Sequence, residues 1–272
     1  MVTTADHRSA PDANRVLYDE AGASKYVNSA PHLKHRRLVE FHTSLIESVY
    51  SAAARDSETV RVLDLGAGEG SCAYNFLRLG ATVTAVDISE HQLERLQVRC
   101  KCFSQRLELR HEDAWDALQR PDRYEVVVAN SFLHHVPDYL ALIRRALAHI
   151  AMEGQFLSFQ DPLRYDTMTR TSYAFSNMSY FAWRTFQGNL WQGLKTRIRR
   201  ARGIYIEGSK EDDAEYHVTR NGVDQIAICS LLESSGFHCR LIRYFSTQSA
   251  ILQRVGSWLD LPNTFAVVGR HC

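Results

Sequence analysis

The 272-residue sequence predicts a doubly wound α/β fold, with a mostly parallel sheet between two layers of helices. Two observations carry this prediction. Apolar β-type runs alternate with helical patterns five times between residues 60 and 159, and such alternation is typical of this fold class. The run 124–129 is apolar almost throughout, as strands covered on both faces are. Because ligands of these folds bind at the carboxyl ends of the strands, the residues that follow each strand are the functional candidates.

A glycine-rich turn follows the first predicted strand, which spans residues 60–65. Three glycines stand at alternate positions before a helix expected over 71–79, which Gly80 ends as a C-cap residue. Such a turn aims backbone N–H groups and the positive end of a helix at one point, and glycine lets a ligand approach where a Cβ would collide. The candidate binding residues of this turn are Asp64, Gly66, Ala67, Gly68 and Gly70.

The next two predicted strands, 82–86 and 107–110, are both followed by an acidic residue. Asp87 comes about twenty residues after the glycines, where a carboxylate can accept hydrogen bonds from both hydroxyls of a ribose. Between the two strands, a capping-box pattern opens a helix expected over 89–102. The candidates at these two strand ends are Asp87, Ile88, Asp113 and Ala114.

The fourth and fifth predicted strands end in polar residues of a different kind. Strand 124–129 is followed by an amide, a hydroxyl and two histidines, and a helix is expected over 138–151. Strand 155–159 is followed by an acid. Histidine exchanges protons near neutral pH, so this edge of the sheet is where we look for acid–base chemistry. The candidates here are Asn130, Ser131, His134, His135 and Asp161.

The four strand ends together resemble class I S-adenosylmethionine-dependent methyltransferases, of the bacterial small-molecule O-methyltransferase type. The GxGxG spacing is one residue tighter than the GxGxxG of dinucleotide enzymes, which argues against the alternative of a nicotinamide-dependent dehydrogenase. The resemblance implies a Rossmann-like, seven-stranded sheet whose last strand is antiparallel. It also implies that Asp87 binds the ribose, that Asp113 and Ala114 bind the adenine, and that Asn130 and Ser131 lie near the methionine moiety. The cofactor would be S-adenosyl-L-methionine and the product S-adenosyl-L-homocysteine.

We divide the chain into four parts. They are an N-terminal helical cover (1–58), a cofactor-binding core (59–162), an inserted helical lid that would select the substrate (163–221) and a C-terminal part of the core sheet (222–272). In the last part, a helix is expected over 223–235, and strands 238–245 and 264–269 would form an antiparallel pair because no full helical crossover joins them.

The cover and the lid carry further substrate-side candidates. Pro31 is expected to separate a short helix from a longer one in the cover, and apolar residues three or four apart predict one amphipathic lid helix over 183–198. The cover residues that would close over a ligand are Tyr18, Tyr26, His32, Lys34 and His35. Each of them also fits an ordinary surface position with a satisfied polar tip.

Methyl transfer to a hydroxyl requires a base near the methyl group, because the sulfonium carbon is already electrophilic. His134 is the preferred base, with His135 and Asp161 as alternatives. The expected acceptor is a saccharide, a glycolipid or a secondary metabolite. N- or C-methylation of a small molecule, RNA methylation and cofactor binding without catalysis remain alternatives, although strand four lacks the Asn/Asp-Pro-Pro-Tyr/Phe pattern of amino-methylating nucleic-acid enzymes.

Composition limits the partners and the compartment. The formal net charge is +1, so no overall field recruits nucleic acid or an anionic membrane. Six dispersed cysteines without CxxC pairs predict reduced thiols and no zinc site, and the charged N-terminus predicts a cytoplasmic protein. Magnesium near Asp161 is possible, but no ligand cluster supports it, so we expect no metal. A homodimer is possible.

Overall fold

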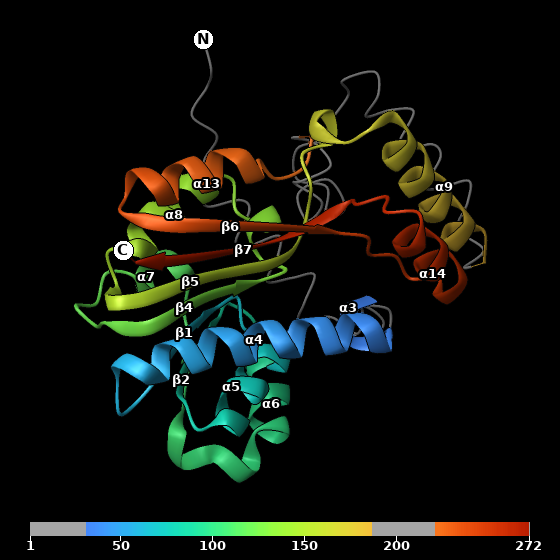
Figure 1. Ribbon diagram of the computed structural model, residues 1–272. Helices are drawn as coiled ribbons and strands as arrows, with labels where there is room; N and C mark the ends of the chain where they lie inside the picture. The colour runs from blue at the N-terminus through green and yellow to red at the C-terminus, as the bar shows by residue number, and fades with distance from the viewer. Residues whose placement is uncertain (1–30, 187–220, 272) are drawn as a thin grey trace.

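The computed structural model describes residues 31–186 and 221–271, which contain a seven-stranded sheet with the order β3-β2-β1-β4-β5-β7-β6 (Figure 1). The strands are β1 (Arg61–Leu65), β2 (Thr82–Asp87), β3 (Leu107–His111), β4 (Tyr124–Asn130), β5 (Ile150–Pro162), β6 (Phe237–Tyr244) and β7 (Thr264–His271). Strands β1 to β5 pair in parallel, and β7 is antiparallel to both β5 and β6. The predicted doubly wound sheet with an antiparallel last strand is therefore confirmed.

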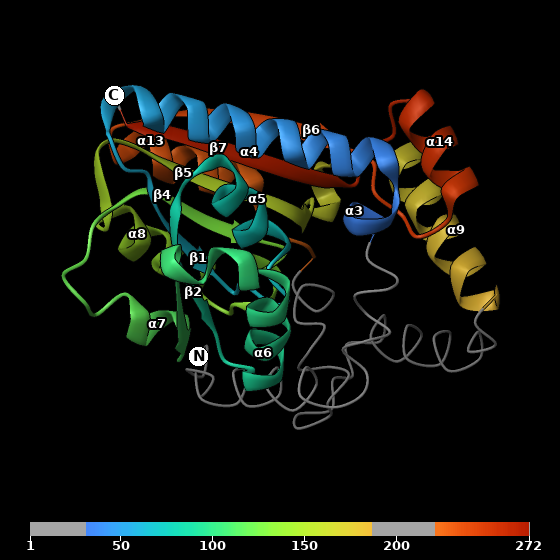
Figure 2. The same cartoon turned by 90° about the horizontal axis from the view of Figure 1, so that it is seen from below.

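One face of the sheet is covered by α4 (Arg36–Asp56), α5 (Ser71–Leu79) and α6 (Glu90–Arg99), as Figures 1 and 2 show from two sides. Apolar residues of α4 recur at helical spacing and are buried against this face, where Phe76 and Leu77 of α5 are also fully buried. Removing this much apolar surface from water is the main stabilising contribution to the layer.

The opposite face is covered by α7 (Ala114–Ala117), α8 (Tyr139–Leu147) and α13 (Gln225–Ser234). Leu142 and Ile143 of α8 and Ile228 of α13 pack there against Phe156 of β5. Because both faces are covered, the central strands are apolar on both sides, and β4 is buried along nearly its whole length.

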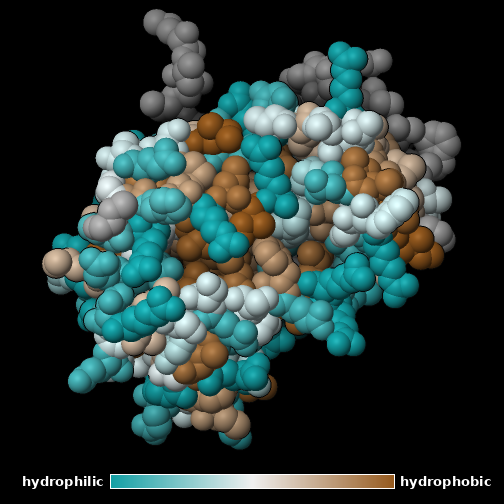
Figure 3. Space-filling model, viewed as in Figure 1, coloured by the Kyte–Doolittle hydropathy of each residue, from teal (hydrophilic) through white to brown (hydrophobic). Residues whose placement is uncertain are grey.

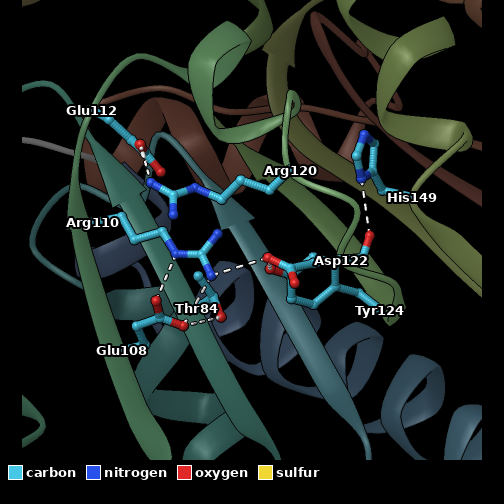
Figure 4. A network of polar contacts seen from close by, with 8 residues as sticks. All are labelled: Thr84, Glu108, Arg110, Glu112, Arg120, Asp122, Tyr124 and His149. Atoms are coloured by element: carbon cyan, nitrogen blue, oxygen red, sulfur yellow. Dashed lines mark hydrogen bonds and ion pairs between the residues drawn. The ribbon is translucent and has the colours of Figure 1, made fainter.

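A polar network takes the place of a helix over part of this second face, because α7 is only one turn long (Figure 4). Arg110 of β3 donates to Glu108 at 2.7 Å and to Asp122 at 3.2 Å, and Thr84 of β2 donates to Glu108 at 3.2 Å. Nearby, Arg120 donates to Glu112 at 2.7 Å. These ion pairs lie away from the carboxyl ends of β1 and β4, so we assign them a structural role at the edge of the sheet.

Two helices extend beyond one end of the sheet, α9 (Arg170–Phe186) and α14 (Ala250–Trp258), and they lie side by side in both Figure 1 and Figure 2. The ring centroids of Phe175 and Phe245 are 5.4 Å apart, and Asn263 donates to Ser176 at 3.1 Å. Helix α9 therefore packs onto the loops that follow β6 and precede β7, and Gln253 of α14 donates to the Phe245 carbonyl at 2.7 Å.

The chain leaves the sheet after β5 and returns to it at nearly the same point. Leu163 and Val223 form a parallel β-bridge, the Tyr165 amide donates to the Asn221 carbonyl at 2.8 Å, and the Val223 amide donates to the Pro162 carbonyl at 3.1 Å. We call these contacts the clasp. Gly222 completes it at a φ of +84°, where an added Cβ would lie 2.2 Å from the Leu163 carbonyl oxygen.

Several predicted boundaries are wrong. Helix α8 ends at Leu147 instead of 151, because Ile150 already pairs with Tyr124 and the strand β5 begins there. Pro31 begins the short helix α3 (Pro31–Lys34), which a break at His35 separates from α4, and the short helix predicted before Pro31 lies outside the described residues. Helix α6 ends at Arg99 and is followed by a 3-10 turn, η1 (Lys101–Arg106). Two further 3-10 turns are η2 (Leu133–His135) and η3 (Tyr165–Thr167).

Three other expectations also change. The inserted helix begins at Arg170, well before residue 183, and the rest of the predicted helix lies outside the described residues. Helix α14 stands between β6 and β7, where no helix was expected. Cys229 of α13 and Cys239 of β6 form a disulfide, so the prediction that all six cysteines are reduced thiols is wrong.

The surface is mixed in character. Figure 3 shows hydrophilic side chains over most of one face, with apolar side chains visible between α13 and α4. None of the helices that the structure describes combines the length and the apolar character needed to cross a bilayer.

Candidate functional site

The glycine turn is fixed between two neighbouring layers of the fold. Gly66, Gly68 and Gly70 all have positive φ values, which glycine adopts without strain. An added Cβ would lie 2.2 Å from the Phe132 ring at Gly66 and 2.5 Å from Leu96 at Gly70, whereas at Gly68 it would meet nothing within 4 Å. The turn is therefore packed at both ends and open at its middle glycine, where a ligand can approach the backbone.

Asp64 lies beneath this turn and is completely buried. Among the described residues, neither of its carboxyl oxygens has a hydrogen-bond partner. Burial and, to a smaller extent, the Asp87 carboxylate raise the pKa of Asp64 to about 8. The Ala73 amide opposes this rise, but it lies outside hydrogen-bond geometry with either Asp64 oxygen. A cation bound at this point would favour the charged form of Asp64.

Asp87 ends β2 and ties the glycine turn to the next helix. Its carboxylate accepts the Gly68 amide at 2.8 Å and the Ser89 amide at 2.9 Å. These two amides take two of the about four acceptor positions of a carboxylate. The adjacent Ile88 carbonyl lies 3.0 Å from His111 Nε2. As predicted, Ser89 caps α6 and accepts the Gln92 amide.

Asp113 follows β3 and caps α7. One of its oxygens accepts the Trp115 amide at 2.7 Å, and burial raises the pKa of this carboxyl above its ordinary value. Ala114 is buried directly after it. The ends of β2 and β3 are neighbours in the sheet, because Asp87 pairs with His111, so these two acids lie on the same edge as the glycine turn.

Asn130 and Ser131 stand at the end of β4. The side-chain oxygen of Asn130 is buried and lacks a hydrogen-bond partner in residues 31–186 and 221–271. Ser131 has a φ of +51°, and its amide donates to the Phe159 carbonyl at 2.8 Å. The next residue, Phe132, packs against Gly66, so the end of β4 and the glycine turn face each other.

His134 and Asp161 form a buried pair at the ends of β4 and β5. His134 Nδ1 lies 2.7 Å from Asp161 Oδ1, and the same oxygen accepts the His134 amide at 3.1 Å. Ser158 donates to the other oxygen of Asp161 at 3.1 Å. Because the carboxylate can only accept, it holds the proton of a neutral His134 on Nδ1 and leaves the lone pair on Nε2.

Of the other predicted substrate-side residues, His135 contacts the His134–Asp161 pair. The His135 ring centroid lies 3.9 Å from that of His134. His35 is buried and contacts the Thr247 carbonyl at 2.7 Å, and Lys34 is exposed. Tyr18, Tyr26 and the side chain of His32 lie outside the described residues.

The structure adds residues that the sequence patterns did not single out. Ser158 has an ordinary place inside a strand, and its contact with Asp161 arises from a bulge that periodicity does not reveal. Tyr244 lies 84 positions from Gln160, which it contacts, and nothing local in the sequence indicates this. In the described ranges, no group of three or more His, Cys, Asp or Glu side chains is placed to hold a metal ion.

Comparison with known protein families gives one match over most of the chain. The sequence pattern of the family described as "Methyltransferase domain" matches residues 35–239. Among curated proteins, a ubiquinone biosynthesis O-methyltransferase of Xanthomonas campestris pv. campestris is 33% identical over 129 residues, which are 47% of this chain and 51% of the relative. A protein of the same name from Aeromonas salmonicida is 34% identical over 97 residues, 35% of this chain and 40% of the relative. The chain spans about half the length of the curated relatives it matches.

Solved structures share the fold at low sequence identity. The magnesium protoporphyrin IX methyltransferase of Synechocystis PCC 6803, crystallised with bound SAM, superimposes with a TM-score of 0.54 at 14% identity and covers 97% of both chains. A [4+2]-cyclase superimposes with a TM-score of 0.60 at 13% identity and also covers 97% of both chains. These likenesses show the fold, which is shared by proteins described with different reactions.

Proposed function

Because this chain belongs to the methyltransferase-domain family, the class I S-adenosylmethionine-dependent methyltransferases, we propose that it methylates a hydroxyl group of a small-molecule acceptor, with His134 as the base. The observation that carries the base is the 2.7 Å contact between His134 Nδ1 and Asp161 Oδ1. The curated relatives are named as O-methyltransferases, which supports oxygen as the methylated atom.

Buried acceptor atoms and the open glycine support S-adenosyl-L-methionine binding at the strand ends. This cofactor carries two positive groups, and the buried Asp64 and Asn130 oxygens without partners in the described chain are acceptors for such groups. In our proposal Asp87 binds the ribose hydroxyls, Asp113 and the Ala114 amide bind the adenine, and Gly68 marks where the backbone lies closest to the ligand. The remaining predicted contacts, at Gly66, Ala67, Gly70, Ile88 and Ser131, line the same edge of the sheet.

The cofactor supplies an electrophilic methyl group on its sulfonium sulfur, so the protein has to orient an acceptor and remove one proton. In our proposal His134 Nε2 takes the proton of the acceptor hydroxyl as the oxygen bonds to the methyl carbon. The electrons of the breaking carbon–sulfur bond remain on sulfur, which leaves S-adenosyl-L-homocysteine. Asp161 stabilises the imidazolium that forms, because it accepts the Nδ1 proton at short distance.

The acceptor class remains as the sequence suggested: a saccharide, a glycolipid or a secondary metabolite. We propose that the inserted segment between Leu163 and Asn221 selects it, because α9 carries exposed or half-buried aromatic side chains such as Tyr173, Phe175 and Trp183. Rings of this kind stack on flat or sugar-like faces. The names of the curated relatives add quinone-type compounds to the set worth testing.

A labelling experiment tests the proposal. The purified protein is incubated with methyl-labelled S-adenosyl-L-methionine and separate pools of saccharides, phenols and quinols, amines and tRNA, and the labelled product is identified by mass spectrometry. We expect an O-methyl product from a hydroxylated pool and at least about 100-fold slower formation by His134→Gln. Label found only on nitrogen, on carbon or in tRNA would contradict the proposed hydroxyl acceptor.

One alternative is kept because a similar fold is described as a [4+2]-cyclase. In that case the protein would bind the cofactor without consuming it. The same incubation separates the two functions, since a protein of this kind forms no S-adenosyl-L-homocysteine in the presence of any pool.

A further inference from the structure

Asp161 owes its direction to a bulge in β5. The pairing of β5 with β7 shifts register between Phe159 and Asp161, so Gln160 is an extra residue. Side chains of a regular strand alternate between the two faces, which would place Ser158 and Asp161 on opposite sides. Instead, Ser158 donates to Asp161 at 3.1 Å, and both lie on the face that holds His134. The bulge therefore turns the carboxylate towards the histidine.

The bulged residue adopts a backbone conformation that it would not choose by itself. Gln160 has a φ of +68°, in the left-handed region that costs free energy for any residue except glycine. Such a conformation persists where surrounding contacts hold it. The contacts around Gln160 therefore decide whether the bulge, and with it the direction of Asp161, is kept.

The hydroxyl of Tyr244 supplies the central contact. It accepts a hydrogen bond from the Gln160 amide at 3.0 Å and donates one to the Gln160 side-chain oxygen at 3.1 Å. Gln160 is the residue that the pairing of β5 with β7 skips. His42 Nε2 of α4 lies 3.2 Å from the same hydroxyl, and Gln160 Nε2 donates to Ser246 at 2.9 Å. Three elements, α4, β5 and β6, thus converge on one phenol.

We propose that Tyr244 is a positioning residue for the His134–Asp161 pair: its hydroxyl holds Gln160 in the bulge that turns Asp161 towards His134. The catalytic consequence rests on the proposed function, whereas the geometric claim does not. Burial raises the pKa of Tyr244 well above its ordinary value, so the phenol keeps the proton that it donates to Gln160. The titratable groups that face it are His42 from α4 and Asp161 from β5.

The test removes only the hydroxyl. In Tyr244→Phe, the proton NMR signal of His134 Nδ1–H, assigned by its absence in His134→Gln, should disappear or move upfield, because the Asp161 carboxylate turns away. Tyr124→Phe is the matched control: Tyr124 is also buried but lies at the start of β4, far along the strand from the pair, and its variant should keep the signal. An unchanged signal in folded Tyr244→Phe would overturn the proposal.

A rescue separates positioning from general damage. Glycine adopts positive φ without strain, so Tyr244→Phe combined with Gln160→Gly should recover the signal that Tyr244→Phe loses. If Tyr244→Phe does not fold, Gln160→Ala is measured instead, and it should weaken the signal because it removes both side-chain contacts to Gln160. Failure of the double variant to recover the signal, while it remains folded by circular dichroism, would contradict the role of the bulge.

Kinetics then connect the geometry to the proposed function. With an acceptor in hand, Tyr244→Phe should lower kcat about 10- to 100-fold and leave the Kd for the cofactor unchanged. If the NMR result holds but His134→Gln transfers methyl groups at the wild-type rate, the proposed base is wrong and the positioning of the pair stands. If the NMR result fails while His134→Gln is inactive, the base stands and the role of Tyr244 is wrong.

Discussion

Two halves of the same sheet edge differ in whether their buried polar side chains have hydrogen-bond partners within the described protein. In the half formed by the ends of β1 and β4, the Asp64 and Asn130 oxygens have no hydrogen-bond partner among the residues described. In the half formed by η2 and β5, Asp161 is equally buried but accepts three hydrogen bonds, two from His134 and one from Ser158. In our proposal the cofactor supplies the partners of the first half, whereas the protein's own residues supply those of the second.

The functions that we propose for the two halves account for this difference. An unsatisfied buried polar group costs about 1–3 kcal/mol, so it is retained where a ligand supplies the missing partner. A base, by contrast, has to present one nitrogen in a fixed direction before the acceptor arrives, and satisfied partners fix that direction. The following predictions test whether the two halves are separable in this way.

The largest effect is expected in the histidine half. His134→Ala should lower the rate of methyl transfer about 10²- to 10⁴-fold, because it removes the proton acceptor, and should leave the cofactor Kd unchanged by calorimetry. His135→Ala is the neighbouring control and should retain most of the activity. A His134→Ala protein that turns over normally but binds cofactor poorly would place this residue in the other half.

A smaller effect is expected at the end of β2. Asp87→Ala should weaken cofactor binding by about 1.5–3 kcal/mol, roughly 10- to 150-fold in Kd, because hydrogen bonds to a charged carboxylate are lost. Titration calorimetry measures this change. Asp116→Ala removes an exposed acid from the nearby helix α7 and should bind the cofactor like the wild type. Equal affinity of Asp87→Ala and Asp116→Ala would refute the ribose assignment.

Asp64 tests the free-energy cost of the first half. The pKa of Asp64 is about 8 in the folded protein and near 3.8 in the unfolded chain. Between these two pH values the folded state keeps a proton that the unfolded state releases, so the stability falls as the pH rises from about 4 to about 8. Without cofactor, Asp64→Asn should flatten this slope and be more stable than the wild type at pH 9 by about 1–3 kcal/mol in urea unfolding. The same variant should bind the cofactor more weakly. Lower stability of Asp64→Asn than of the wild type at pH 9 would contradict the assignment.

The smallest effect on stability is expected at Gly68. Gly68→Ala should cost about 1 kcal/mol, since its φ of +53° strains alanine but the added Cβ meets no atom. The methyl group would stand where the ligand approaches, so cofactor affinity should fall by more than the stability does. In Gly66→Ala the added Cβ collides with Phe132, so the loss of stability should exceed the loss of cofactor affinity. Thermal unfolding measures the first quantity and calorimetry the second.

Much of the fold follows from short-range sequence signals. The helix 71–79 with its Gly80 cap and the capping role of Ser89 agree with the structure, because turn and capping chemistry is local. The extent of α8 could not be predicted in this way. Residues 148–151 suit a helix by composition, and only the pairing of Ile150 with Tyr124, which lies on another strand, assigns them to β5.

The candidate site divides along the same line. Each strand-end residue could be proposed from the sequence, because the topology of a doubly wound sheet brings strand ends together. The contact of His134 with Asp161 joins two of these residues, but its geometry depends on the Gln160 bulge and on Tyr244, which lies 84 positions further along the chain. Periodicity does not reveal this bulge, because residues 154–159 of β5 are all buried and show no alternation that an extra residue could shift.

The clasp beside β5 has a consequence for how relatives of this protein can diverge. Since Leu163 and Val223 are bridged, the two ends of the inserted segment meet beside β5, so the pairing of the sheet does not depend on the length of that segment. Doubling the length of a flexible excursion costs only about 0.6 kcal/mol in closure entropy. Segments of different length can therefore be inserted at this junction without a change in the strand pairing that holds the candidate site.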